Sequence, residues 1–459
     1  MTLKKANSTI KTVKFYLTFS KVKPLNKSLF RPSTAEKLSW IVAAILVLLP
    51  FHALLTTWAG SNLGHLDLFR IWKEIILTLI LPLAAYLAWT SPQIKHWLLN
   101  SWVTRLFGVY ILLHAILGVW ALLTDKTTGS AVVYSLIVNL RFVGFWLICA
   151  VLAARSDFLE KHWQKILIIP AAVVIIFGIF QALALPMDFL RHFGYGPETI
   201  PAFQTVDSKP ELQRIQSTLR GANPLGAYLV LIIPAVLLIV RQNRIFQVGL
   251  LIGAIYGLYY TYSRSAWLGL GLALITLLVM SRKIKLTKQL LAAGVLAALI
   301  VLAGTLQFLR TNQSVQDALL HTSQTSNVAV TSNEARLSAM RQGASDVTSE
   351  PLGRGPGTAG PASFRNEGHQ PRISENYFLQ IGQEVGILGM AMIAAIMFLV
   401  AKELWQRRDD NLARILLASF IGLTFINLIS HAWTDDTLSY LFWGLAGIAC
   451  APTLVKPKR

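Results

Sequence analysis

The sequence contains few charged residues and few cysteines for its length. Of its 459 residues, 14% are charged and 54% are hydrophobic, whereas roughly 25% of an average soluble domain is charged. The two cysteines, Cys149 and Cys450, both lie inside apolar runs. This composition excludes collagen-like, disordered and disulfide-rich proteins. Because the apolar residues come in blocks too long for a globular core, it also excludes a soluble protein and indicates a polytopic membrane protein.

The apolar blocks predict an all-α fold. A bilayer core about 30 Å thick needs roughly 20 apolar residues in helical conformation. By this measure the sequence contains about twelve transmembrane helices, together with a long outer loop that itself contains short helices. The predicted spans are residues 38–58, 71–90, 102–123, 130–153, 164–186, 223–241, 245–261, 266–281, 289–308, 377–401, 412–431 and 438–455.

Positive charge is in excess, because 42 lysines and arginines face 22 acidic residues, giving a formal net charge of +20. Basic residues recur between alternate spans, so the positive-inside rule places both termini in the cytoplasm. Most of the excess then sets orientation, with some attraction to anionic membrane lipids, and it does not indicate a nucleic-acid partner. The predicted parts are a cytoplasmic tail (1–37), nine helices with an outer loop at about 187–222 (38–308), a large extracytoplasmic loop (309–376), three helices (377–455) and a final tail (456–459).

Ten arginines remain on the predicted outer side, against the positive-inside bias, and they need another explanation. They are Arg191, Arg214, Arg220, Arg264, Arg310, Arg336, Arg341, Arg354, Arg365 and Arg372.

A first polar patch runs from Arg214 to Pro224 and leads into the sixth predicted helix. Asn223 and Pro224 predict a helix start, with the asparagine as cap and the proline in the first turn. Arg220 then lies beside a helix N-terminus, where free amides favour an anion. The alternative is a loop arginine that reaches towards lipid headgroups.

A second patch is Ser263-Arg264-Ser265, which separates two short apolar spans and predicts a tight helical hairpin. Serine hydroxyls and an arginine fork suit bidentate recognition of phosphate. The alternative is that Arg264 is a structural anchor beside interfacial aromatic residues.

The third patch is the large loop. A capping box ending at Glu334 and apolar residues at helical spacing predict an amphipathic helix over about 333–348, which presents Arg336 and Arg341. A glycine-rich turn follows, without the ending of a Walker loop. Glu375 then stands at the start of the tenth span. The alternative for Ser374 and Glu375 is that they only cap that helix.

Taken together, the segments LRGANPLGAYL, YSRSAWLGL and EARLSAM…EPLGRGPG…ENYFLQIGQEVGILGM resemble the O-antigen ligase / O-antigen polymerase family of C-type membrane glycosyltransferases. The resemblance covers about residues 200–400. It implies a GT-C-like fold in the bacterial cytoplasmic (inner) membrane. It also implies transfer of a glycan from an undecaprenyl-diphosphate carrier to a glycan, lipid or protein acceptor at the outer side. Arg220 and Arg264 match the arginines that hold the lipid diphosphate in that family.

The sequence departs from the family at one position. The family ligases have a histidine, the proposed base or orienting group, directly before the asparagine at the end of the loop, and this sequence has Glu375. Three alternatives follow: Glu375 takes that role, His369 takes it, or the catalytic geometry differs. The candidate substrate-binding residues on the outer side are Arg220, Arg264, Arg336, Arg372, Arg214, Ser263 and Ser265.

The implied chemistry requires no metal or other cofactor. Arginines can stabilise a leaving diphosphate, and each charge-assisted hydrogen bond contributes about 1.5–3 kcal/mol. A carboxylate such as that of Glu375 can accept the proton of an acceptor hydroxyl. One in-line displacement predicts inversion at the anomeric carbon. No spacing of histidine, cysteine and aspartate in the sequence suggests a metal site.

Polar residues inside the predicted spans form a further group. Arg141 lies near the middle of the fourth span, where an arginine costs roughly 2.5–3.5 kcal/mol and should face a partner or a substrate cavity. Lys73 and Glu74 lie near the outer end of the second span, where they can pair or line the donor cleft. We expect the histidines inside the spans to be packing residues; they are His52, His114 and His431.

Two other classes compete with a glycosyltransferase: a flippase for lipid-linked oligosaccharides, and an envelope scaffold. The sequence shows no repeat between its halves of the kind common in transporters, and a transporter has no evident use for a long loop rich in arginine and glycine. Within the enzyme class both ligase and polymerase remain open, and the long loop favours the ligase.

Overall fold

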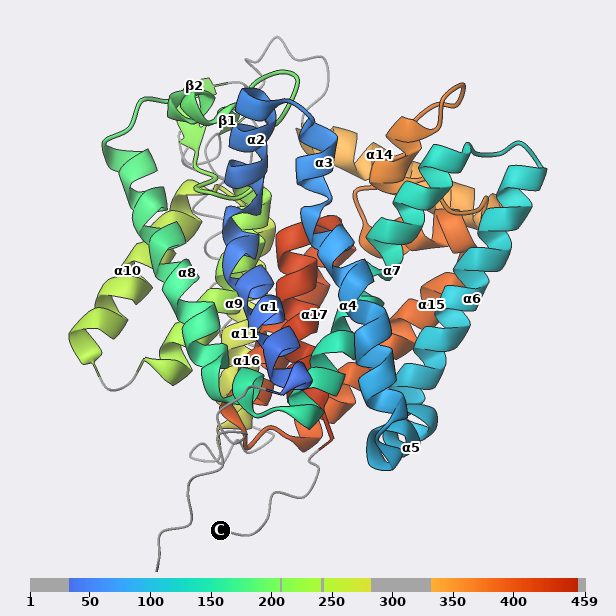
Figure 1. Ribbon diagram of the computed structural model, residues 1–459. Helices are drawn as coiled ribbons and strands as arrows, with labels where there is room; N and C mark the ends of the chain where they lie inside the picture. Colours follow the sequence, from blue (N-terminus) through green and yellow to red (C-terminus); the bar gives the residue numbers. More distant parts are fainter. Residues whose placement is uncertain (1–32, 207–208, 241–242, 282–331, 453–459) are drawn as a thin grey trace, which may run out of the picture.

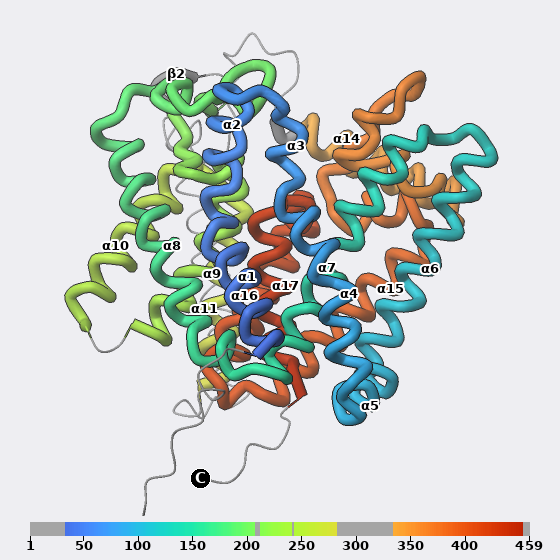
Figure 2. Tube along the Cα trace, in the orientation of Figure 1, coloured from blue at the N-terminus to red at the C-terminus, as the bar shows by residue number. Residues whose placement is uncertain are grey.

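A computed structural model describes residues 33–206, 209–240, 243–281 and 332–452. In these residues the regular structure is helical apart from one two-stranded hairpin. Figures 1 and 2 show the long helices side by side in a bundle, with the described C-terminal end of α17 at the bottom and α14, β1 and β2 at the top. The chain is therefore an all-α polytopic membrane protein, as predicted.

The first half of the chain ends with the two-stranded hairpin. Its elements are α1 (Thr34–Leu48), η2 (Leu49–Phe51), α2 (His52–Leu63), α3 (Leu66–Arg70), α4 (Trp72–Trp89), α5 (Pro92–Asn100), α6 (Trp102–Leu123), α7 (Gly129–Arg155), α8 (Phe158–Leu183), η3 (Phe189–Phe193), β1 (Gln204–Val206) and β2 (Lys209–Arg214).

The second half adds the remaining helices and the long connection before α15. Its elements are α9 (Ala222–Ile239), α10 (Arg244–Tyr260), α11 (Arg264–Met280), α14 (Ser332–Ser349), η5 (Gly360–Arg365), α15 (Tyr377–Gln406), α16 (Asn411–Leu428), η6 (Ala432–Thr434) and α17 (Asp436–Cys450).

Eight described segments are long and apolar enough to cross a membrane, and α10 and α11 are shorter apolar helices of 17 residues each. Eleven of the twelve predicted spans coincide with described helices, the last of them with α17. The predicted span 289–308 lies outside the described residues, as do Arg310 and most of the tail at 1–37. The first span is longer than predicted, since Thr34–Leu63 continues across a short 3-10 turn at Pro50. A proline that lacks an N–H is tolerated at the start of such a turn.

At two helix starts the structure differs from what the sequence suggested: the predicted Asn223 cap was wrong, and so was the alternative in which Glu375 caps the next helix. Gly221 rather than Asn223 is the N-cap of α9, and the Asn223 side chain instead accepts a hydrogen bond of 2.6 Å from Arg214. At α15 the N-cap is Asn376, whose side chain accepts from the backbone N–H of Leu379 at 3.0 Å. Glu375 therefore does not cap α15, and its carboxylate is available for other contacts.

The predicted hairpin at Ser263-Arg264-Ser265 has a tight turn, but its helices diverge. α10 packs on α8 and α9, whereas α11 packs on α9 and most extensively on α16. The contact between α11 and α16 is close because Gly269 and Gly422 face each other: a Cβ added at Gly269 would lie 2.9 Å from the carbonyl oxygen of Gly422. Small residues of this kind let membrane helices approach closely. α11, whose first turn contains Ser265, is thereby packed closely against α16, the helix that leads to η6.

The long connection before α15 is tied to a kink in that helix. α14 confirms the helix predicted over 333–348. After it, the N–H groups of Arg354 and Gly355 donate to the carbonyls of Gln383 and Glu384 at 2.9 and 2.7 Å. α15 is interrupted there by Gly386, whose φ of +72° places it in the left-handed region that favours glycine. The kink thus opens α15 so that its backbone pairs with the loop.

Glu384 fixes this junction from inside the protein. Its side chain is 1% exposed and accepts hydrogen bonds from Ser135 and Asn139 of α7 and from the backbone N–H of Gly357. A buried carboxylate is tolerated when hydrogen-bond donors satisfy it in this way. Glu384 therefore joins the glycine-rich loop, α7 and α15, which together support the site described below.

Candidate functional site

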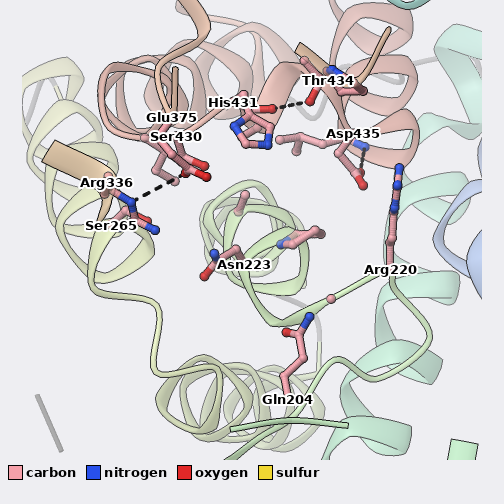
Figure 3. Close-up of a pocket in the computed structure, with 17 residues that line it drawn as sticks. Gln204, Arg220, Asn223, Ser265, Arg336, Glu375, Ser430, His431, Thr434 and Asp435 are labelled. Atoms are coloured by element: carbon pink, nitrogen blue, oxygen red, sulfur yellow. Dashed lines mark hydrogen bonds and ion pairs between the residues drawn. The ribbon is translucent and has the colours of Figure 1, made fainter. Parts of the chain in front are cut away.

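The three polar patches meet at a cavity of about 340 Å³, shown in Figure 3. Each patch contributes to its lining: Arg220, Gly221 and Asn223 come from the first, Ser265 from the second, and Arg336 and Glu375 from the third. The connection between α16 and α17 closes the cavity. It contributes the lining residues Ser430, His431, Ala432, Thr434 and Asp435.

Arg220 stands at one edge of the cavity, directly before α9. Among the described residues, no side chain forms an ion pair or a hydrogen bond with its guanidinium. Its neighbours Gly221 and Asn223 belong to the start of α9 and also line the cavity. The N–H of Ala222 donates to the Gln204 side chain, but the dipole of α9 still gives this helix end partial positive charge. Both this dipole and the Arg220 guanidinium favour an anion here.

Arg336 and Glu375 form the opposite wall. The guanidinium Nε of Arg336, on α14, lies 3.6 Å from a carboxylate oxygen of Glu375, and each side chain is about one third exposed, at 32% and 31%. Glu375 has a φ of +51°. Non-glycine residues in that region are strained by roughly 1–3 kcal/mol and are held there by their surroundings. The loop end is thus bent so that its carboxylate points to Arg336 (Figure 3).

His431 lies between these walls and was expected to be only a packing residue. In the structure its imidazole lines the cavity beside Ser430 and Thr434. Burial lowers the pKa of His431; the carboxylate of Glu375 acts in the opposite direction, and Arg220 and Arg336 lower it further. The net pKa lies below the ordinary value of 6.5, so the imidazole is neutral at pH 7.

Asp435 is the second lining residue that sequence reasoning missed. One of its carboxylate oxygens accepts from the N–H of Leu438 at 3.1 Å and caps α17. Burial raises the pKa of Asp435, and the adjacent carboxylate of Asp436 raises it further. The pair Asp435-Asp436 is visible in the sequence. Its position beside Arg220 follows only from the fold.

The other predicted site residues lie around the cavity rather than in its lining, as far as the described residues show. Arg214 donates to the Thr261 carbonyl at 2.7 Å, and Arg372 pairs with Asp346 at 3.3 Å. Arg264 begins α11, and the hydroxyls of its neighbours Ser263 and Ser265 lie 3.2 Å apart. These contacts hold the walls in place.

His369 lies six residues before Glu375 in the loop. Its exposed imidazole makes a contact of 3.3 Å between Nδ1 and the carbonyl of Glu367, and it is not part of the cavity lining. The catalytic role predicted for Glu375 or His369 stays a prediction, but only Glu375 reaches the cavity.

A second cavity, of about 770 Å³, adjoins the first. It lies between α2, α3 and α4 on one side and α7 on the other, and Arg220 and Asp435 line both cavities. Arg141, expected to face a partner or a cavity, does both: it lines this space and pairs with Asp436 at 2.6 Å.

A compact group of charges forms part of the wall of the second cavity. Lys73, which is fully buried, pairs with Glu74 at 3.1 Å and with Asp436 at 2.8 Å. His52 also reaches Asp436, at 3.2 Å. Arg141 donates in addition to the Thr434 carbonyl, so the start of α17 is held from three directions.

Metal ligands do not gather in the part of the chain that the structure describes: no group of three or more histidine, cysteine, aspartate or glutamate side chains could hold an ion there. The cations of the site are arginines instead.

Comparison with protein families gives one match. Residues 248–394 match the O-antigen ligase family model. This O-antigen ligase region runs from α10 into α15 and carries four lining residues of the first cavity: Ser265, Arg336, Pro361 and Glu375. Arg220, His431 and Asp435 lie outside the matched O-antigen ligase region and complete the cavity from both sides. No curated protein matches the chain.

Proposed function

We propose that this protein is a membrane glycosyltransferase of the O-antigen ligase type. In this proposal it moves a glycan from an undecaprenyl-diphosphate carrier to an acceptor hydroxyl, at the outer side of the bacterial cytoplasmic membrane and with both termini in the cytoplasm. The observation that carries the proposal is the meeting of Arg220, Arg336 and the first turns of α9 and α11 at one polar cavity. The match to the O-antigen ligase model supports it.

The cavity offers the groups that displacement of a diphosphate requires. As the bond between the anomeric carbon and the phosphate oxygen breaks, its electron pair stays on the phosphate, and negative charge grows there. Arg220 has no protein partner among the described residues and can donate to that oxygen, while Arg336 approaches from α14. Donors placed before the charge develops stabilise the transition state without reorganisation. No metal is needed for this role.

The remaining predicted residues take supporting roles in the proposal. Ser265 contacts the diphosphate together with the two arginines. Arg214 holds the first turn of α9 through Asn223, and Arg372 fixes the loop end through Asp346. Arg264 and Ser263 stand at the first turn of α11, beside Ser265. Arg141 fixes the start of α17.

A base must accept the proton of the acceptor hydroxyl, and three lining residues can do so. Glu375 is the base predicted from the sequence, and His431 and Asp435 are candidates added by the fold. The raised pKa of Asp435 brings that carboxyl closer to the range in which a general base works well at neutral pH, whereas the lowered pKa of His431 favours the neutral imidazole, the form that can accept a proton.

The test is transfer by the purified protein in liposomes that contain a polyprenyl-diphosphate glycan and an acceptor. We expect product from the wild type and a loss of about ten- to 100-fold for Arg220→Ala, from about 1.5–3 kcal/mol per charge-assisted hydrogen bond. Arg191→Ala is the matched control, because Arg191 pairs with Asp188 outside the cavity. Movement of intact donor across the membrane without transfer, unaffected by Arg220→Ala, would instead identify a flippase.

The polymerase alternative differs only in the acceptor. Long polymer formed from the lipid-linked donor alone would identify a polymerase. Transfer only after a separate acceptor is added would identify a ligase. We propose the ligase because the matching family model is that of the O-antigen ligase.

A further inference from the structure

The second cavity contains groups that the reaction at the diphosphate does not use. Its volume of about 770 Å³ falls within the range of small-molecule sites in proteins, roughly 300–1,000 Å³. It opens beside Arg220 and Asp435, which also line the first cavity. A molecule bound here would therefore have one end at the proposed diphosphate site.

Most of the lining surface is apolar, with hydroxyl groups between the apolar side chains, although eight of the lining residues are charged. Ala53, Ile71 and Ile137 supply apolar surface, and Thr56 and Tyr134 supply hydroxyls. The ring of Tyr134 carries the Arg365 guanidinium 4.6 Å from its centre, which fixes the ring in place. Such a lining suits a ligand that alternates C–H faces with hydroxyl groups.

The lining carries four arginines and four carboxylates, so its formal charges balance in number, although two arginines share Asp67 and Arg220 and Asp435 form no ion pair within the described residues. Asp67 lies 3.4 Å from Arg70 and 3.8 Å from Arg365. Asp436 and Glu74 are paired with Arg141 and the buried Lys73 as described above. Of the four arginines in the lining, Arg220 alone has no ion pair within the described residues. A paired charge can still exchange hydrogen bonds with a hydroxyl, but it offers no net attraction to an anion.

These features differ from those of the first cavity, where the starts of two helices add positive charge and Arg220 is available. An anionic diphosphate is favoured there. A neutral ligand rich in hydroxyls is favoured in the second cavity.

We propose that the second cavity is the acceptor site, and that the acceptor is a neutral saccharide rather than a protein side chain or an anionic lipid headgroup. The proposal rests on the proposed function and names the substrate class that the sequence left open. The acceptor hydroxyl would reach the boundary between the cavities, at Asp435.

Transfer in this arrangement is a single displacement at the anomeric carbon. The acceptor oxygen forms a bond to the anomeric carbon of the donor, and its proton passes to the carboxylate of Asp435. The bond from that carbon to the diphosphate breaks on the opposite side, and the leaving diphosphate keeps the electron pair beside Arg220 and Arg336. No oxidant, reductant or metal takes part. Approach from the second cavity makes Asp435, rather than Glu375, the group nearest to the incoming hydroxyl.

The experiment measures transfer to neutral oligosaccharide acceptors by an Ile137→Trp variant, which fills the second cavity from α7. We expect the acceptor KM to rise at least tenfold, while the inhibition constant of inorganic diphosphate stays within twofold of the wild type. The matched control is Ile169→Trp on α8, where the side chain is 60% exposed. Its acceptor KM should be unchanged.

A second, conservative variant guards against misfolding. Tyr134→Phe removes only a hydroxyl, and it should raise the acceptor KM two- to fivefold without changing the diphosphate constant. Unchanged acceptor KM in both variants would overturn the acceptor site, and so would a serine peptide or an anionic glycolipid accepting the glycan as well as the neutral saccharide does. If the wild type transfers no glycan at all and does not bind diphosphate, the proposed function itself fails, which is a different outcome.

Discussion

The two cavities that meet at Arg220 and Asp435 are built from different kinds of structure. The walls of the second cavity come mainly from helices, namely α2, α3, α7 and the starts of α4 and α17, and most of its charged side chains form ion pairs such as Arg141–Asp436. The first cavity is built from loop ends and helix starts, and its arginine at the boundary, Arg220, has no partner in the described residues. Paired charges thus stabilise the cavity wall, whereas the unpaired guanidinium of Arg220 is available to bind a ligand.

The largest effect on stability should come from removing the carboxylate that pairs with the buried cations of the second cavity. Asp436→Asn removes the shared partner of Lys73 and Arg141, whose side chains are 0% and 4% exposed. Leaving buried cations uncompensated costs about 3–5 kcal/mol. We expect a large drop in the unfolding temperature of the detergent-solubilised protein.

The control for that variant is Asp188→Asn, which removes an exposed pair with Arg191. Exposed pairs contribute about 0–1 kcal/mol, so its unfolding temperature should stay close to that of the wild type. Equal drops in unfolding temperature for the two substitutions would contradict the distinction between the buried ion pairs of Asp436 and the exposed pair of Asp188.

The next effect concerns the available arginine. Arg220→Gln should reduce transfer about ten- to 100-fold with little change in unfolding temperature, because no protein contact is lost. Arg141→Gln should lower the unfolding temperature more than Arg220→Gln does and should reduce transfer less, because it breaks the ion pair with Asp436. Steady-state transfer rates and thermal unfolding of the two variants, measured side by side, decide the matter. If Arg220→Gln lowered the unfolding temperature as much as Arg141→Gln, the contrast between an available and a paired arginine would be wrong.

A smaller effect is expected where the loop behind the first cavity meets α15. Gly386→Ala forces a side chain into the left-handed region, at about 1–2 kcal/mol, and its Cβ would lie 2.6 Å from the carbonyl carbon of Leu352. We expect looser docking of the glycine-rich loop, seen as faster proteolysis of residues 350–376. Gly249→Ala is the control, since open space surrounds it. Equal proteolysis of the two variants would argue against the kink as an anchor.

The smallest effect should be a shift in pH dependence. The pKa of His431 lies below 6.5, so the neutral imidazole is lost as pH falls through that pKa. If transfer requires neutral His431, Arg336→Gln removes a cation that lowers the pKa, and the acid limb of the pH–rate profile should move to higher pH. Glu375→Gln removes the carboxylate that raises the pKa, and the limb should move to lower pH. Shifts in the same direction would exclude His431 as the titrating group.

The fold was largely predictable from the sequence because span length and apolar composition are local properties. The spans at 102–123 and 130–153 differ from α6 and α7 by no more than two residues at any end. The capping box before Glu334 likewise predicted α14. The short hairpin of β1 and β2 was not predicted, since its strands carry no long alternating pattern.

The site was predictable only in part. The three motifs predicted Arg220, Ser265, Arg336 and Glu375 as site residues, because these residue types can bind an anion or accept a proton. All four line the first cavity. Their catalytic and binding roles stay predictions. The sequence treated Arg214 and Arg372 in the same way as Arg220, because nothing local shows that Asn223 and Asp346 engage them.

What the sequence by itself determined is the membrane architecture and the presence of more outer arginines than orientation requires. Only the tertiary structure decided which arginine is paired and which is available. Arg141 and Asp436 are 295 positions apart in the chain, and His431 enters the site from a turn that follows α16. The physical reason is that an ion pair depends on a few ångströms of separation and on burial, and both are set by how distant helices pack rather than by neighbours in the chain.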